Sequence, residues 1–187
     1  FTRLGQAVPD SNIRATAEYD AAAALINMAA WDRAAGMLEQ YRRDYPDSEF
    51  ADDISQKLAV TYMETGRASQ AAAEFERIAV AETSSDEVRR EALWKAAELY
   101  EAGGIVASEK RVLEDIVARY PDPLSESIEA RYRLLEIAET QGNSAEVTAR
   151  LNDIIDVDAR AGAQRTDRTR FLAAKASVRL AEPIRKR

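Results

Sequence analysis

Two pairs of glutamates are the residues of this sequence whose spacing could do chemistry. Glu98 and Glu101 are three positions apart, and so are Glu136 and Glu139. Residues at that spacing lie on one face of an α-helix, so each pair could bring two carboxylates together. Paired carboxylates serve as acid and base in glycoside hydrolysis, and they bind divalent metal ions. These pairs are therefore the candidates for a catalytic or metal site.

The composition removes most of the other groups that such a site needs. The chain has no histidine and no cysteine, so it lacks the commonest general base, the usual nucleophile pairs, the usual zinc ligands and any disulfide. No glycine-rich stretch could cradle a phosphate. Because 32% of the residues are charged, such glutamate pairs are the ordinary solvated face of a surface helix. We expect no enzyme activity, no cofactor and no metal site.

The charge and the hydropathy pattern exclude two further kinds of partner. The formal net charge is −7, which opposes binding to nucleic acid or to an anionic membrane surface. No apolar run approaches the roughly 20 residues that cross a bilayer. We therefore expect no nucleic-acid partner and no direct insertion into a membrane.

The pattern of apolar residues indicates paired helices throughout. Leu58 and Tyr62 are four residues apart and share one helical face, and Ala71 and Phe75 form a matching stripe further on. Gly66 stands between the two stripes, where glycine can adopt the left-handed conformation that ends a helix. The chain has only seven glycines and five prolines, and 46% of its residues are hydrophobic. These features predict two antiparallel helices, joined by a tight turn and packed through a continuous core.

The same pattern recurs along the chain with a nearly constant period. The equivalent positions Leu25, Tyr62, Tyr100 and Ala138 are spaced by 37, 38 and 38 residues. Chance amphipathicity would not keep that register through four turns. We predict full repeats and single flanking helices with these boundaries: full repeats at 12–46, 48–83, 85–122 and 123–159, and single helices at 1–8 and 166–180.

One position in the third repeat departs from the pattern. Glu109 stands where the first two repeats have Ala34 and Ala71, small residues that let two helices approach closely. This departure weakens the match of the third repeat, and the neighbouring Ser108 could take the close contact instead. In the second repeat, we expect Ala71 to lie against the facing helix with no room for a larger side chain.

Helical hairpins with this spacing resemble the tetratricopeptide repeat family. The resemblance rests on Leu58-Ala59-x-x-Tyr62, the turn at Gly66 and Ala71-x-x-x-Phe75, and its equivalents cover nearly the whole chain. The family period is about 34 residues, and the surplus here falls at the start of each first helix. The resemblance implies an all-α, right-handed superhelical solenoid of helix-turn-helix repeats that serves as a non-catalytic scaffold for protein partners.

A narrower resemblance points to a cellular setting. The long period and the Tyr-Pro-Asp motifs at 45–47 and 120–122 resemble bacterial cell-envelope members of the family. Those members include the lipoprotein of the outer-membrane-protein assembly machine and the periplasmic coordinator of the Tol–Pal system. This resemblance implies a bacterial periplasmic protein that acts in envelope assembly or maintenance, with a cytoplasmic scaffold as the alternative. Because the chain begins with Phe1 rather than Met, we expect residues 1–187 to be one repeat segment of a longer protein.

Members of the family bind partners in the concave groove lined by their first helices. The groove residues should be those offset from the packing stripe of each first helix. We predict ten of them: Tyr19, Asp53, Gln56, Met63, Glu91, Trp94, Glu98, Glu129, Tyr132 and Glu136. Five are acidic, three are aromatic and none is basic. The expected occupant is therefore an extended or helical segment that carries Lys or Arg and one apolar anchor.

The surface is also compatible with other functions of such repeats. The chaperone-tail clamp of some family members needs lysine and asparagine in the groove, and it is excluded because these residues stand there: Tyr19, Ala23, Gln56 and Val60. The segment could instead be a structural spacer or oligomerisation element without a ligand site, its acidic face merely solvated. Uncapped repeats at the ends would expose Phe1, Leu4, Phe171 and Leu172. We therefore expect weak end-to-end self-association.

Overall fold

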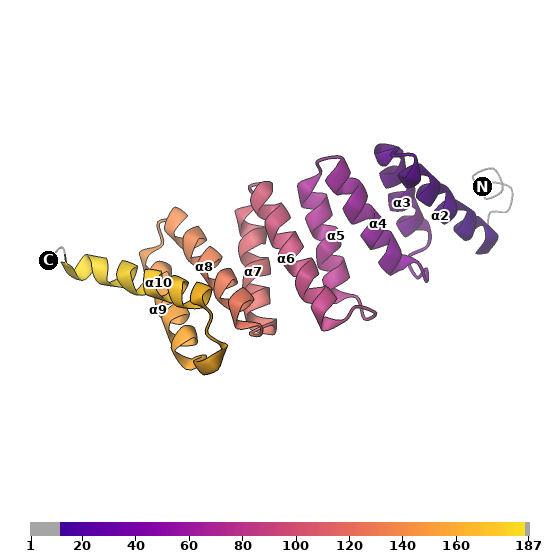
Figure 1. Cartoon of the computed structure of the whole chain (residues 1–187). Coiled ribbons are helices and arrows are strands. Elements are labelled where there is room, and N and C mark those ends of the chain that lie inside the picture. The colour runs from indigo at the N-terminus through magenta and orange to yellow at the C-terminus, as the bar shows by residue number, and fades with distance from the viewer. Residues whose placement is uncertain (1–11, 186–187) are drawn as a thin grey trace. The chain divides into compact units, whose positions relative to one another are not determined.

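The computed structural model describes residues 12–185, which form nine α-helices, one short 3-10 helix and no strand (Figure 1). The helices are α2 Asn12–Asn27, α3 Trp31–Asp44, α4 Ala51–Glu64, α5 Ala68–Val80, α6 Asp86–Ala102, α7 Val106–Arg119, α8 Leu124–Thr140, α9 Ser144–Arg160 and α10 Asp167–Arg185, with the 3-10 helix at Gly162–Gln164. The all-α architecture of helical hairpins is thereby confirmed. The helix predicted at 1–8 lies outside the described residues.

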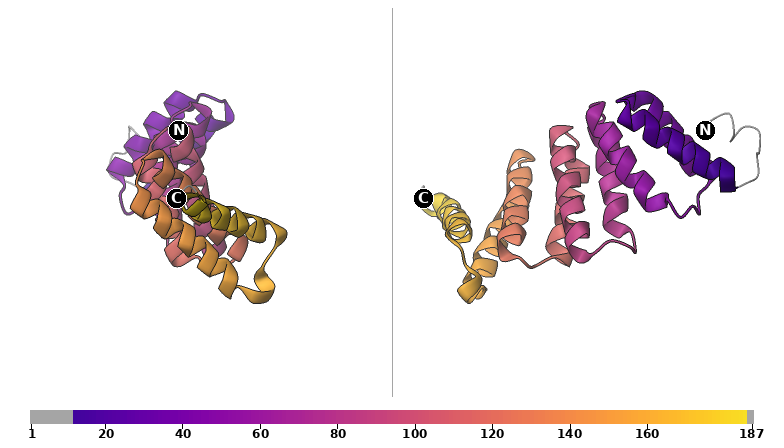
Figure 2. Two further views of the ribbon diagram at one scale, coloured as in Figure 1. Left: turned by 90° about the vertical axis from the view of Figure 1, so that its left-hand side faces the viewer. Right: turned by 45° about the vertical axis from the view of Figure 1, so that its right-hand side comes forward.

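The chain divides into two compact units. Unit 1 ends at Ile105 and contains α2 to α6, whereas unit 2 begins at Val106 and contains α7 to α10. Within each unit every helix packs against the next one along the chain, as two further views show (Figure 2). The right-handed superhelix of the whole chain stays a prediction.

Residues in the left-handed conformation make the hairpin turns. The φ angles are +71° at Gly66, +67° at Gly104 and +69° at Gly142, as expected for helices that end on glycine. The first hairpin has no glycine at this point, and Ala29 adopts a φ of 53° there. Because a Cβ atom disfavours that region, the first turn is strained where the other turns are not.

Buried alanines set the spacing of the helices in unit 1. Ala22, Ala34, Ala59 and Ala71 are completely buried, and a methyl side chain lets neighbouring helix backbones approach closely. Ala71 also belongs to a core cluster of both helix types, whose members are Ala22, Ala35, Leu38, Tyr41, Ile54, Leu58, Tyr62 and Ala71. The burial expected for Ala71 is therefore confirmed.

Two core tyrosines tie each first helix to the second helix before it. The Tyr62 hydroxyl donates to Glu39 Oε1 at 2.7 Å, and the Tyr100 hydroxyl donates to Glu76 Oε1 at 2.7 Å. Burial and the bond to Glu39 raise the pKa of Tyr62 to about 12. Both tyrosines are buried, as their place in the packing stripe predicts.

The glutamate that interrupts the pattern is buried in unit 2. Glu109 on α7 is 6% exposed, and its carboxylate accepts a hydrogen bond from Arg133 Nη2 on α8 at 2.7 Å. Glu109 itself thus occupies the position, while Ser108 remains half-buried. The contact expected of Ser108 is replaced by an ion pair between two helices.

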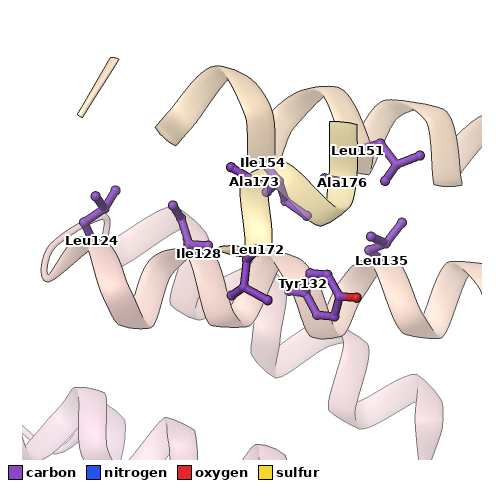
Figure 3. Close-up of a cluster of buried hydrophobic side chains, with 9 residues drawn as sticks. All are labelled: Leu124, Ile128, Tyr132, Leu135, Leu151, Ile154, Leu172, Ala173 and Ala176. Atoms are coloured by element: carbon purple, nitrogen blue, oxygen red, sulfur yellow. The ribbon is translucent and has the colours of Figure 1, made fainter. Parts of the chain in front are cut away.

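The last helix closes one side of unit 2. Leu172, Ala173 and Ala176 of α10 complete a core with α8 and α9 (Figure 3), whose other members are Leu124, Ile128, Tyr132, Leu135, Leu151 and Ile154. Leu172 is only 1% exposed, whereas its neighbour Phe171 is 56% exposed. The expectation that Leu172 lies at an open end is therefore wrong, because α10 turns this residue onto α8 and α9. Phe1 and Leu4 lie outside the described residues.

The sequence misplaces the end of α10. The sequence predicts that the helix stops at residue 180, before Pro183, whereas it continues to Arg185. Proline removes one backbone donor, but Ala181 and Glu182 are good helix formers. The loss of one hydrogen bond therefore does not end the helix.

Enlarging Ala71 tests the close helix contact. Ala71→Leu should lower the free energy of unfolding by about 1–3 kcal/mol, because an isobutyl group must displace packed neighbours. The control is Ala73→Leu, at an exposed position of the same helix, which should change stability by less than about 0.5 kcal/mol. Urea denaturation followed by circular dichroism measures both, and equal stabilities of the two variants would contradict the packing described.

Removing one partner of the buried ion pair tests the role of Glu109. Arg133→Met should cost about 3 kcal/mol, because it leaves a buried carboxylate without its cation. Adding Glu109→Leu to that variant should restore most of the loss. As a control, Arg160→Met removes the exposed pair with Asp156 and should have little effect. A double variant no more stable than Arg133→Met would show that the pair is not the cause.

Candidate functional site

The ten predicted groove residues differ widely in exposure and are divided between the units. Those that are exposed are Gln56, Glu91, Glu98 and Glu136, those that are half-buried are Tyr19, Asp53, Met63, Trp94 and Glu129, and Tyr132 is buried. The residues up to Glu98 belong to unit 1, and those from Glu129 onward belong to unit 2.

In unit 2, α10 covers most of the predicted set. Glu129 Oε1 accepts from Arg168 Nη2 at 2.8 Å. Tyr132 is 4% exposed, its hydroxyl accepts from Arg179 Nη1 at 3.2 Å, and Lys175 Nζ lies 4.9 Å from its ring centroid. Tyr132 is thus a core residue and is not available to a partner, which corrects its assignment to the groove. A basic helix of the same chain occupies the place expected for a basic partner.

In unit 1, a cluster of polar contacts joins α2 to α4. The Tyr19 hydroxyl donates to Asp53 Oδ2, and the Tyr19 ring stacks on Phe50 with 4.3 Å between centroids. Lys57 Nζ lies 3.0 Å from Asp53 Oδ2 and 5.4 Å from the centroid of the Tyr19 ring. Burial and the bond to Asp53 raise the pKa of Tyr19. Tyr19 and Asp53 therefore hold two first helices together.

Two lysines that the sequence analysis left out lie beside the predicted acidic residues. Lys57 pairs with Asp53, and Lys95 pairs with Glu98 at 3.0 Å. Glu91 is exposed on the same helix as Glu98. The acidic character of unit 1 is thus weaker than the sequence indicated, because two of its carboxylates are partly neutralised by neighbours.

A pocket between α2 and α4 is the feature that the sequence analysis missed. Its volume is about 270 Å³, and it is lined by Ala23, Ile26, Asn27, Asp53, Gln56, Lys57 and Val60. Small-molecule sites occupy roughly 300–1,000 Å³, so this pocket suits a single side chain of a larger ligand. Val60 is 42% exposed there. Ala23 and Val60 occupy equivalent positions of successive repeats, and this spacing was the available signal.

Met63 and Trp94 are intermediate cases. Met63 packs against the core cluster of unit 1, so it supports the first helices more than it faces a ligand. Trp94 on α6 is half-buried, and the position equivalent to it on α4 is Gln56, which lines the pocket. Trp94 therefore stays a candidate for contact with a partner.

The glutamate pairs do not come together with a metal-binding group. Within residues 12–185 no cluster of three or more potential ligands could hold a metal ion. Glu98 and Glu101 are exposed, and Glu139 Oε2 forms an ion pair with Arg179 Nη1 at 3.0 Å. Among the described helices, none is long and apolar enough to cross a membrane.

Comparison with known proteins identifies the repeat. The model of the tetratricopeptide repeat family matches residues 16–48 and 91–123. No curated protein matches the chain. Two crystal structures of nearly identical TPR-like repeats, from a Podosopora anserina protein described as a kinesin light chain, are similar. The first is of a variant with one point substitution, and it is 20% identical over 92% of this chain and 93% of that chain. The second, which lacks the substitution, is 19% identical over 95% of this chain and 96% of that chain. The TM-score is 0.49 for both.

Proposed function

We propose that this chain, which belongs to the tetratricopeptide repeat family, is a non-catalytic scaffold that holds a segment of a partner protein on the first helices of unit 1. Tetratricopeptide repeats generally mediate protein–protein interactions. The observation that carries the proposal is the side-chain-sized pocket between α2 and α4. An exposed apolar pocket with polar neighbours is the arrangement by which folded proteins anchor a peptide.

The pocket would take the apolar anchor of the partner segment. Ala23, Ile26 and Val60 supply its apolar wall, and burial of an aliphatic side chain there gives roughly 25 cal/mol for each Å² of apolar surface removed from water. The exposed side-chain amides of Asn27 and Gln56 offer both donors and acceptors to a polypeptide backbone. The partner should therefore bind as a polypeptide with a single buried side chain.

The acidic residues of α6 would select the charge of the partner. Glu91 and Glu98 are exposed, and the chain has a net charge of −7. Exposed charges contribute more to the rate of association and to partner choice than to affinity. Since Lys95 already pairs with Glu98, the attraction for Lys or Arg on the partner should be moderate and sensitive to salt.

The setting that we propose is envelope assembly or maintenance in the bacterial periplasm. Its support is the sequence resemblance carried by the long period and the two Tyr-Pro-Asp motifs. Separation of periplasmic from cytoplasmic fractions of cells that make the full-length protein tests it. Recovery of the protein in the cytoplasmic fraction would contradict the envelope role and would not affect the proposal that the chain is a scaffold.

Peptide selection with a tryptophan variant tests the proposed surface. Random peptides selected on the chain should combine Lys or Arg with one apolar residue. Trp94→Ala should weaken binding of a selected peptide by about 1–3 kcal/mol in calorimetry while the thermal unfolding temperature stays near that of the parent. Raising the salt concentration from about 0.1 M to about 1 M shortens the screening length from about 10 Å to about 3 Å. The affinity of the parent chain for the peptide should fall as a result.

A charge placed in the pocket gives the matched control. Val60→Asp should abolish binding of the same peptide, whereas Val80→Asp, at an exposed valine of α5, should leave it unchanged. If Trp94→Ala and Val60→Asp both bind like the parent, the partner does not use this surface. A chain that selects no peptide at all would favour the alternative, a structural spacer within a longer repeat protein.

A further inference from the structure

A second pocket of unit 1 lies at the other end of α2, against the loop that joins α3 to α4. Its volume is about 390 Å³, and it is lined by Ala15, Thr16, Tyr41, Tyr45, Pro46, Asp47, Ser48, Glu49 and Phe50. It shares no lining residue with the pocket between α2 and α4. A ligand could therefore occupy it independently of the peptide surface proposed above.

The half-buried rings of Tyr45 and Phe50 form the accessible aromatic part of its wall, whereas the lining residue Tyr41 is only 1% exposed. The rings of Tyr41 and Tyr45 are 4.7 Å apart between centroids, and Phe50 stacks on Tyr19 at an interplanar angle of 16°. The Tyr41 hydroxyl lies 3.0 Å from Ser48 Oγ, at hydrogen-bond distance. Because these contacts hold the rings in place before any ligand arrives, binding would cost little further ordering.

The charged residues of the wall have one sign. Asp47 and Glu49 are exposed, and the lining contains no basic side chain. On α2, Arg14 Nε lies 2.8 Å from Glu18 Oε1, an ion pair that neutralises its charge. Burial is the largest cause that raises the pKa of Tyr45, the charge of Glu18 adds to it and the charge of Arg14 opposes it. Because the Arg14–Glu18 pair has no net charge, Asp47 and Glu49 set the sign of the potential at the pocket. The pocket should therefore attract a cation and repel phosphate.

Aromatic faces and carboxylates together recognise organic cations. A ring attracts an ammonium or guanidinium group within about 6 Å of its centroid, and carboxylates add charge-assisted hydrogen bonds. We propose that this pocket is a second docking site of the scaffold, which takes the cationic side chain of a lysine or arginine of the partner protein. This inference rests on the proposed function in one respect only, which is that the lysine or arginine belongs to the partner protein.

Titration with small cationic probes tests the site directly. Nα-acetyl-lysine methylamide and Nα-acetyl-arginine methylamide should each shift the amide NMR signals of Thr16, Tyr45 and Asp47 and reach saturation, with a dissociation constant on the order of 1 mM. Nα-acetyl-norleucine methylamide has nearly the same shape without the charge, and it should bind at least about ten-fold more weakly. Equal binding of the norleucine probe would show an apolar pocket and overturn the proposal.

Variants separate this site from the peptide surface. Asp47→Asn combined with Glu49→Gln should weaken the lysine probe at least about five-fold, since it removes both charges of the wall. Glu91→Gln combined with Glu98→Gln makes the same change in net charge on α6 and should have no effect. Tyr45→Leu, which keeps an apolar side chain but removes a ring, should also weaken binding.

Two further outcomes would overturn the inference. One is a lysine probe that never saturates the pocket signals, and the other is a probe affinity that Asp47→Asn with Glu49→Gln leaves unchanged. Val60→Asp, which blocks the pocket between α2 and α4, should leave probe binding intact. If peptide binding depends on Val60 but the probes do not bind, this site is ruled out and the proposed function stands. If the probes bind but no peptide binding depends on Val60, the cation site stands and the proposed peptide surface is ruled out.

Discussion

Close contact between helices at buried alanines is the constraint on which the rest of unit 1 depends. Ala34 of α3 and Ala71 of α5 are completely buried, and α3 packs against both α2 and α4. The second helices therefore fix how far apart the first helices lie. That separation forms the pocket between α2 and α4, and it allows Tyr19 to reach Asp53. The proposed binding site is therefore a surface pocket whose width is set by the packing of the helices.

The sequence predicts features that arise from neighbours along the chain. Helical periodicity and glycine conformation are local properties, so the hairpins and the left-handed turn at Gly66 could be predicted. Pairs of residues distant in sequence could not. The carboxylate of Glu109 is buried because Arg133, on the next helix, neutralises it, and periodicity carries no information about such a partner.

The candidate site shows the same division. The sequence identified the first helices and several exposed residues, such as Gln56 and Glu98. It did not show that Lys95 lies beside Glu98, or that α10 would bury Tyr132. Periodicity describes each helix by itself, whereas the charge and exposure of a residue depend on what packs across from it. Pockets are formed by two elements together, which is why both were missed.

Contacts between the peptide anchor and the methyl groups of the α2–α4 pocket test the central claim most directly. In a complex with a selected peptide, intermolecular nuclear Overhauser effects should connect the apolar anchor to the methyl groups of Ala23, Ile26 and Val60, which line the pocket. Effects to Val80 of α5 in place of these three would place the partner on a second helix and contradict the account.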